Sequence, residues 1–291
     1  MCNRHGNEFH SLTGSVRLTP PISKPPIFIY HKRKQKLLRQ PEAVTRATVL
    51  AWNVGHRAGI YPTIPTEMIK ALGLLDADVV LLNEYYDDGR QDRRRFREQL
   101  AAIGYVHCDQ SPAERRHNRI FVASRLPFTI GDIPAPQGPT SHATTNFLHV
   151  RLDNSDIELI GLRRPDYKGA EKIQYWAEVT DILRSVGDRA LVIAGDVNEK
   201  LFKKAPRDVT AVPFPGAEMY SVPRPDGDWS YTNPSGTGQS QIDHVLHTSR
   251  IRVNQVSYRY EVDGIALAAP GPLKKVSLSD HAALTFTAGL A

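Results

Sequence analysis

Short apolar runs that stop at a polar side chain are the most constraining feature of this sequence. VLAWN ends at Asn53, VVLLNE ends at Glu84, and LVIAG is followed directly by Asp196. Short runs rich in Val, Leu and Ile are typical of strands that are buried on both faces. The chain is therefore expected to build sheets that carry polar groups at the ends of buried strands.

Helical periodicity occurs at residues 64–75, 90–103 and 170–186, and the apolar face of the third segment includes Ile173 and Trp176. Further strands are predicted at residues 119–124, 128–132, 145–152, 157–162, 241–248, 253–260 and 282–287. Strands and helices that mix without strict alternation favour stacked sheets flanked by helices over a single doubly wound sheet. We therefore predict an α/β fold of the sandwich type.

The net charge of +6 arises in the first part of the chain. Residues 1–46 carry nine Lys/Arg against two acidic residues, whereas residues 47–291 carry 28 basic and 29 acidic residues. Few apolar residues accompany this charge, so burial cannot offset the entropy of ordering the segment. We predict a basic, disordered leader over residues 1–45 and one domain over residues 46–291. The HKRKQK run is either a tether for a phosphate backbone or a solvated tail.

The cysteine and hydropathy patterns favour a cytoplasmic protein. Cys2 and Cys108 are too few for a disulfide framework in 291 residues. No apolar run approaches the roughly 18 residues of a membrane-spanning helix, and no signal-peptide pattern is visible. We therefore expect a cytoplasmic location without stable membrane association.

The polar residues at the strand ends have the chemistry of a metal-dependent site. Similar residues flank two later strands, in the order Asp243, His244, Asp280 and His281. Carboxylates at the ends of buried strands are rigid and partly desolvated, which suits metal binding and pKa tuning. Oxygen ligands from Asn, Glu and Asp fit Mg²⁺ or Mn²⁺ better than zinc. One such residue alone is usually a cap or turn former, but five strand ends together favour a site.

Seven motifs occur in the order found in a known superfamily: VLAWNVG, LLNE, SRLPF, LIGLRRPDYKG, IAGDVN, SQIDHVL and LSDHAAL. From about Thr48 to Phe286 the chain resembles a divergent member of the endonuclease/exonuclease/phosphatase superfamily, with its deoxyribonuclease-I-like fold. The resemblance implies a four-layer α/β/β/α sandwich of two mixed, largely antiparallel sheets flanked by helices. Residues 46–291 would then be a single catalytic domain.

The resemblance also implies a role for each matching residue. Asn53 and Glu84 would hold Mg²⁺ or Mn²⁺, and Asp280 would be a further ligand or orienting group.

The residues of the last three motifs would act on the substrate. Asp196 would deprotonate the attacking water, and Asn198 would donate a hydrogen bond to the scissile phosphate. His281 would donate to the phosphoryl oxygens, while Asp243 would keep it protonated. These residue types suit the chemistry, because a carboxylate can activate water and a cationic histidine can stabilise developing charge.

The sequence departs from the family pattern at three positions. Arg163 stands where a His or Tyr is common, Asn83 replaces a Gln, and Gln241 replaces an Arg. Arginine can donate to phosphate but cannot shuttle a proton at neutral pH. Further candidates for contact with substrate phosphate are three cations in or near the motif loops: Arg164, Arg119 and Lys275.

The resemblance implies a metal-dependent phosphodiesterase that uses an activated water. A nuclease acting on DNA or RNA is the favoured interpretation, because the basic leader and loops agree with a nucleic-acid partner. Two alternatives stay open. One is a phosphomonoesterase, or an esterase acting on lipid headgroups or inositol phosphates. The other is a catalytically impaired module that binds phosphate or nucleic acid. Trp229 and Tyr231 either stack on bases or pack locally.

Overall fold

The computed structural model describes residues 43–55, 65–86, 92–112, 117–202, 220–233, 235–271 and 277–291. The predicted leader, apart from residues 43–45, and Lys275 lie outside these ranges. Among the residues that the structure describes, no helix combines the length and the apolar character needed to cross a membrane.

The first large sheet has six strands with one parallel pair at its centre. Its order is β12 (Ile251–Arg259), β15 (Ala283–Leu290), β1 (Arg46–Asn53), β2 (Val79–Tyr86), β4 (Asn118–Ser124) and β3 (His107–Gln110). β1 and β2 run parallel, and the other neighbours run antiparallel.

The second large sheet repeats this plan with five strands. Its order is β11 (Asp243–His247), β8 (Leu191–Asp196), β7 (Glu158–Leu162), β6 (Phe147–Leu152) and β5 (Phe128–Ile130). Here β7 and β8 run parallel and the other neighbours antiparallel. Two small hairpins accompany the sheets: β9 (Tyr231–Thr232) with β10 (Gln239–Ser240), and β13 (Glu261–Val262) with β14 (Ile265–Ala266).

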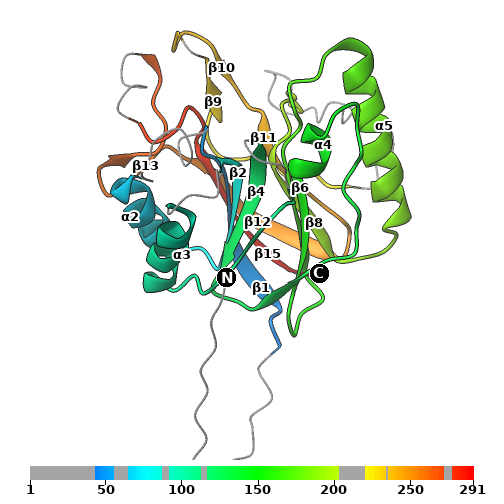
Figure 1. Cartoon of the computed structure of the whole chain (residues 1–291), viewed down its shortest axis with the longest axis horizontal. Helices are drawn as coiled ribbons and strands as arrows, with labels where there is room; N and C mark the ends of the chain where they lie inside the picture. Colours follow the sequence, from blue (N-terminus) through cyan, green and yellow to red (C-terminus); the bar gives the residue numbers. More distant parts are fainter. Residues whose placement is uncertain are drawn as a thin grey trace, which may run out of the picture. The chain divides into compact units, whose positions relative to one another are not determined.

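Helices cover the outer face of each sheet. In Figure 1, α2 (Thr66–Leu75) and α3 (Asp92–Ala102) flank the first sheet, whereas α4 (His142–Thr145) and α5 (Gly169–Ser185) flank the second. Alternate residues of β1 enter two different cores, because successive side chains of a strand point to opposite faces. Val49 and Ala51 pack between the sheets, while Leu50 and Trp52 pack under α2 and α3.

A third core lies beneath α5, so the layers are helix, sheet, sheet and helix. The predicted four-layer sandwich of mixed, largely antiparallel sheets is confirmed. The burial of the central strands on both faces is confirmed as well, since all eight residues of β2 except Tyr86 are buried.

The observed helices and strands differ from the predicted ones where the sequence periodicity is weak. The predicted strand at residues 145–152 begins only at Phe147, because His142–Thr145 form the single turn of α4. The edge strand β3 was not predicted, since HCDQ has no apolar alternation. In α5 the expected face was wrong at Ile173, which is 72% exposed, while Tyr175 is fully buried.

Each parallel pair is a strand–helix–strand unit, β1–α2–β2 in one sheet and β7–α5–β8 in the other. The strands of a parallel pair end at the same edge of their sheet. Asn53 and Glu84 therefore lie together at one sheet edge, and Arg163 and Asp196 lie together at the edge of the second sheet. β8 contacts β1 and β2 across the central core, which brings the two edges together.

Gly195 lies at a close contact between the two sheets. Its φ is +140°, and a Cβ there would lie 2.2 Å from the Leu162 carbonyl oxygen and 2.7 Å from Asn83 Oδ1. Asn83 of the first sheet also donates from Nδ2 to that same Leu162 carbonyl oxygen, at 3.3 Å. A side chain at position 195 would push the sheets apart.

We therefore expect Gly195→Ala to lower the free energy of unfolding by about 3 kcal/mol or more, through overpacking and backbone strain. The matched control is Gly187→Ala, where φ is also positive but nothing lies within 4 Å. That substitution should cost only about 1 kcal/mol. Urea unfolding of both variants measures the difference, and equal losses would contradict the steric argument.

His244 of β11 is a buried structural histidine. Its Nε2 lies 2.8 Å from the Glu199 carbonyl oxygen, and its ring packs edge-on against Phe202 at 5.4 Å between centroids. Burial lowers the pKa of His244 to about 4. The folded protein therefore holds this ring neutral at pH values where the unfolded chain protonates it.

This shift predicts an acid-sensitive fold. Stability from His244 is complete above the unfolded pKa of about 6.5 and is lost as pH falls toward 4, by on the order of 3 kcal/mol. His244→Gln retains a donor for the Glu199 carbonyl but does not titrate, so its unfolding free energy should fall less between pH 8 and pH 4. Urea titrations at several pH values measure this slope, and identical slopes would refute the assignment.

Candidate functional site

An extra residue in β2 turns two neighbouring side chains toward the second sheet. The pairing of β2 with β4 gains one residue between Leu82 and Tyr85, and Glu84 in this bulge has a φ of 54°. Regular alternation would send Glu84 to the face that carries Leu82. The bulge lets Asn83 and Glu84 both reach groups of the second sheet, while Tyr85 returns to the helix side.

Asn53 links the ends of both sheets. It is fully buried at the end of β1, and its Nδ2 donates to Glu84 Oε1 at 3.3 Å and to Asp196 Oδ2 at 2.9 Å. Its Oδ1 accepts the Gly55 N–H at 2.9 Å. One amide thus holds two carboxylates that come from different sheets.

Asp196 is almost completely buried, with 1% exposure. Burial raises its pKa to about 6, although the positive charge of His281 favours the ionised form. Asn198 fixes its orientation, because the Asn198 backbone N–H donates to Oδ1 at 3.0 Å and Nδ2 donates to Oδ2 at 3.1 Å. Asn198 therefore holds the Asp196 carboxylate in this geometry, and its predicted contact with phosphate remains a prediction.

His281 and Asp243 form a buried pair. His281 Nδ1 lies 2.8 Å from Asp243 Oδ2. Burial by itself lowers the pKa of His281, but the charge and the hydrogen bond of Asp243 outweigh it and raise the pKa to about 9. The ring is therefore a cation at neutral pH.

Ser279 couples this pair to β1. The His281 backbone N–H donates to Ser279 Oγ at 3.0 Å, and that hydroxyl donates to the Asn53 carbonyl oxygen at 2.6 Å. Tyr231 packs against the His281 ring with 4.9 Å between centroids, whereas Trp229 is buried in the central core against Tyr260. Local packing is thus the interpretation that holds for Trp229.

Arg163 joins the two acids across the sheets. It follows β7, and its Nη2 lies 2.5 Å from Glu84 Oε1, while its Nε lies 3.8 Å from Asp196 Oδ2. The structure thus brings Arg163 into the same cluster as Asn53, Glu84 and Asp196.

The other predicted residues lie at different distances from this cluster. Asp280 is half-buried next to Gly55, where an added Cβ would lie 3.0 Å from its Oδ1. Arg119 is half-buried on β4 and pairs with Tyr85, just beyond Glu84. Lys275 lies outside the described residues.

Arg164 holds the loop that follows Asp196. It is 5% exposed, and its guanidinium donates to the carbonyl oxygens of Pro165, Tyr167, Val197 and Asn198. These bonds tie the end of β7 to that loop. The contact with phosphate that the sequence suggested for Arg164 remains a prediction.

Sequence patterns did not single out the histidine pair beside Arg163. The rings of His117 and His142 lie 4.7 Å apart between centroids. Burial lowers the pKa of His142, and the nearby His117 and Arg163 lower it further. The only sequence signal near this pair was the basic run Arg115–Arg116, which directly precedes His117. No periodic pattern marks α4, which carries His142.

Two groups of acids and histidines could hold a metal ion among the described residues: Asp196, Asp243 and His281, and Asp132, His149 and Glu158. In the second group Arg189 already binds Glu158 and Asp132, and His149 Nε2 lies 2.8 Å from Glu158 Oε2. That group is therefore an ion-pair network with its own cation. The first group belongs to the strand-end cluster described above.

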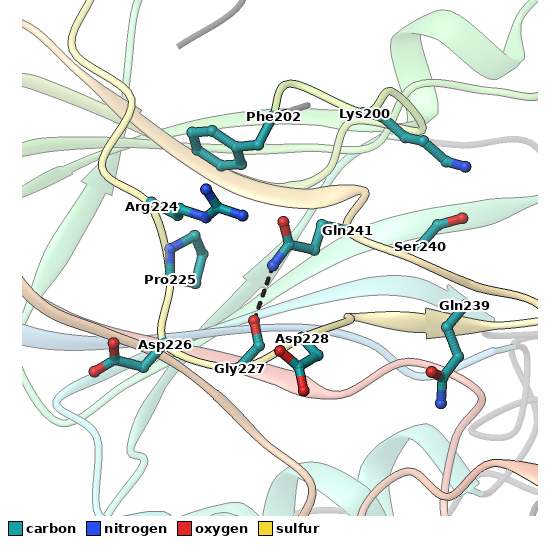
Figure 2. Close-up of a pocket in the computed structure, with 10 residues that line it drawn as sticks. All are labelled: Lys200, Phe202, Arg224, Pro225, Asp226, Gly227, Asp228, Gln239, Ser240 and Gln241. Carbon is teal, nitrogen blue, oxygen red and sulfur yellow. Dashed lines mark hydrogen bonds between the residues drawn. The ribbon is translucent and has the colours of Figure 1, made fainter. Parts of the chain in front are cut away.

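A pocket of about 640 Å³ lies beside the loops that follow β8 and precede β11 (Figure 2). Its wall combines the guanidinium of Arg224, stacked over Phe202 at 5.6 Å, with Gln241, whose Nε2 donates to the Gly227 carbonyl at 2.8 Å. The lining residues are Lys200, Phe202, Arg224, Pro225, Asp226, Gly227, Asp228, Gln239, Ser240 and Gln241. None of the predicted site residues lines it.

Several solved structures share this fold, although their sequence identity to this chain is low. An AP endonuclease from Archaeoglobus fulgidus is 17% identical with a TM-score of 0.59, covering 84% of this chain and 98% of that chain. A 3′ phosphatase, NExo, from Neisseria, bound to a product DNA hairpin, is 16% identical with a TM-score of 0.57, covering 84% and 99%.

An endonuclease/exonuclease/phosphatase from Beutenbergia cavernae DSM 12333 is 19% identical with a TM-score of 0.55, covering 85% of this chain and 72% of that chain. These likenesses show a shared fold. No curated protein matches the sequence.

The family model provides the stronger result, because it matches most of the chain and includes every strand end of the cluster. The model of the Endonuclease/Exonuclease/phosphatase family matches residues 50–281. The chain therefore belongs to the Endonuclease/Exonuclease/phosphatase family.

Proposed function

We propose that this protein is a divalent-metal-dependent phosphodiesterase, and specifically a nuclease that hydrolyses DNA or RNA by attack of an activated water. One observation carries the proposal. Glu84 and Asp196 meet at the Asn53 amide, and a ring nitrogen of the cationic His281 lies within 4.8 Å of an Asp196 carboxylate oxygen. Such a cluster offers three things: acidic oxygens that can bind a cation, a base that can take a proton from water, and a charged donor for the phosphate oxygens.

The donor set fits a hard divalent cation. Glu84 Oε1 and Asp196 Oδ2 both face the Asn53 amide, and carboxylate oxygens are preferred ligands of Mg²⁺ and Mn²⁺. Asn53 and Glu84 would hold the ion, and Asp280, which lies next to Gly55, would be a further ligand or orienting group. When bound, the ion would neutralise charge on the phosphate.

The remaining residues supply the proton and charge chemistry. A pKa of about 6 leaves Asp196 ionised at neutral pH yet basic enough to take a proton from water. His281, held by Asp243 through Nδ1, has Nε2 left to donate to a phosphoryl oxygen as charge develops. Asn198 keeps the Asp196 carboxylate fixed during the proton transfer.

Nucleic acid is the substrate that the surrounding charge supports best. Arg119 and the imidazole rings of His117 and His142 lie on or beside the elements next to Arg163, so one cation and two further hydrogen-bonding rings are present where a phosphate backbone would pass. The Neisseria phosphatase with the same fold was solved with a DNA hairpin, which agrees with this assignment. Phosphomonoesters, inositol phosphates and lipid headgroups are the competing substrates. A module that only binds phosphate is the competing non-enzymatic function.

Metal removal tests the proposed cation. Exhaustive chelation should abolish hydrolysis of single-stranded DNA, RNA or a chromogenic phosphodiester, and Mg²⁺ or Mn²⁺ should restore it. Glu84→Gln should lower the affinity for the metal ion by on the order of tenfold or more, because it removes the charged ligand. The exposed Glu171→Gln is the control. Full activity after metal removal would refute the proposed dependence on a divalent cation.

Replacement of the base and the donor tests the catalytic assignment. Asp196→Asn preserves shape but removes the base, so kcat should fall by on the order of 10²–10⁴. His281→Ala removes the charged donor and should cost on the order of 10²–10³. Asp181→Asn, an exposed acid on α5, is the control. If both site variants keep wild-type rates, the hydrolysis comes from a contaminant and the binding module is favoured. Inositol phosphates and phosphomonoesters belong in the same assay, since their selective hydrolysis would redirect the substrate assignment.

A further inference from the structure

Arg163 occupies the position that the proposed cation requires. Its Nη2 lies 2.5 Å from Glu84 Oε1, and its Nε lies 3.8 Å from Asp196 Oδ2. The arginine side chain is 16% exposed and the Glu84 side chain 11%, so this ion pair is largely withdrawn from water. A guanidinium therefore already pairs with Glu84 and lies near Asp196.

Three buried acids of the cluster share two cations. His281 lies against Asp243 at 2.8 Å, and a ring nitrogen of His281 also lies within 4.8 Å of an Asp196 carboxylate oxygen. The contact of Arg163 with Glu84 is shorter than its contact with Asp196. Isolated carboxylates are costly to bury, so Glu84 needs a partner in the absence of other cations, and Arg163 is that partner.

A divalent ion and the guanidinium compete for the same oxygen. Glu84 Oε1 accepts from Arg163 and from Asn53 Nδ2. Mg²⁺ holds its oxygen ligands at about 2.0–2.1 Å, and a second cation against that oxygen would repel it strongly in a site of low dielectric. Binding of the ion must therefore break the contact between Arg163 and Glu84.

We infer that Arg163 is a built-in counter-ion of Glu84, which competes with the divalent cation and is released toward substrate phosphate when the cation binds. The inference rests on the proposed function, because it assigns the competition to the same metal site. Arg163 Nε is buried and has no hydrogen-bond partner among the described residues, so the guanidinium has an unsatisfied donor to offer. Phosphate oxygens are strong acceptors for arginine.

Two consequences follow from this arrangement. The metal-free site is stabilised by its own arginine, and its affinity for the ion is lower than the acidic ligands alone would give. Metal and phosphate binding are also coupled, since each favours the state in which Arg163 has left Glu84, and such coupling acts equally in both directions.

Mn²⁺ binding without substrate provides the test. Isothermal titration of the full-length, chelator-treated protein should show about tenfold tighter Mn²⁺ binding for Arg163→Gln than for wild type, because the competing cation is gone. The matched control is Arg151→Gln, an exposed arginine on β6, which should bind Mn²⁺ like wild type. In chelator, Arg163→Gln should also melt at a lower temperature and gain more from added Mn²⁺.

Arg163→Met, which fills similar space and carries no charge at any pH, gives a second variant if Arg163→Gln does not fold. It should likewise bind Mn²⁺ more tightly than wild type. Equal Mn²⁺ affinities for wild type and a folded Arg163 variant would overturn the counter-ion inference and leave the proposed metal-dependent function standing. No Mn²⁺ binding by either protein, with no metal-dependent hydrolysis, would overturn both.

Discussion

The burial of negative charge where the two sheets meet is the constraint on which the site depends. Glu84 is 8% exposed, and Asp196 and Asp243 are each 1% exposed. An isolated ionised carboxylate is far too costly to bury, so each needs a cation or several donors. His281 pairs with Asp243, and Arg163 lies beside Glu84 and Asp196. The Asn53 amide donates hydrogen bonds to both Glu84 and Asp196.

Backbone conformations that are rare elsewhere hold these groups in place. Glu84 lies in a bulge with a left-handed φ, Asn198 has a φ of 54°, and Gly195 has a φ of +140°. Conformations of this kind are costly and persist where the surrounding structure fixes them. Two contacts fix these conformations here. Asn83 packs over Gly195, and Arg164 ties the loop after Asp196 to the end of β7. These contacts fix the backbone around the site.

The two halves of the sandwich contribute different chemistry to one centre. The first sheet supplies Asn53 and Glu84, whereas the second supplies Arg163 and Asp196, each set from the ends of a parallel strand pair. Asp243 of the second sheet holds His281, which lies just before β15 of the first, so the catalytic histidine that we propose also depends on both layers. Any shift of one sheet against the other would separate base, donor and acidic ligands together.

The layers and most of the cluster could be predicted from the sequence. Short continuous apolar runs are typical of strands covered on both faces, and polar residues that end such strands lie at sheet edges, so Asn53, Glu84, Asp196 and Asp243 could be named from spacing and motif order. The remaining features depend on how the layers pack. A bulge reverses the side on which Glu84 would lie, which no period-2 pattern reveals. Arg163 and Arg164 are adjacent arginines in the sequence, yet one pairs with the acids and the other is buried under a loop. Their roles differ because neighbouring side chains leave the end of a strand in opposite directions, and only the packing of the second layer fixes what each one meets.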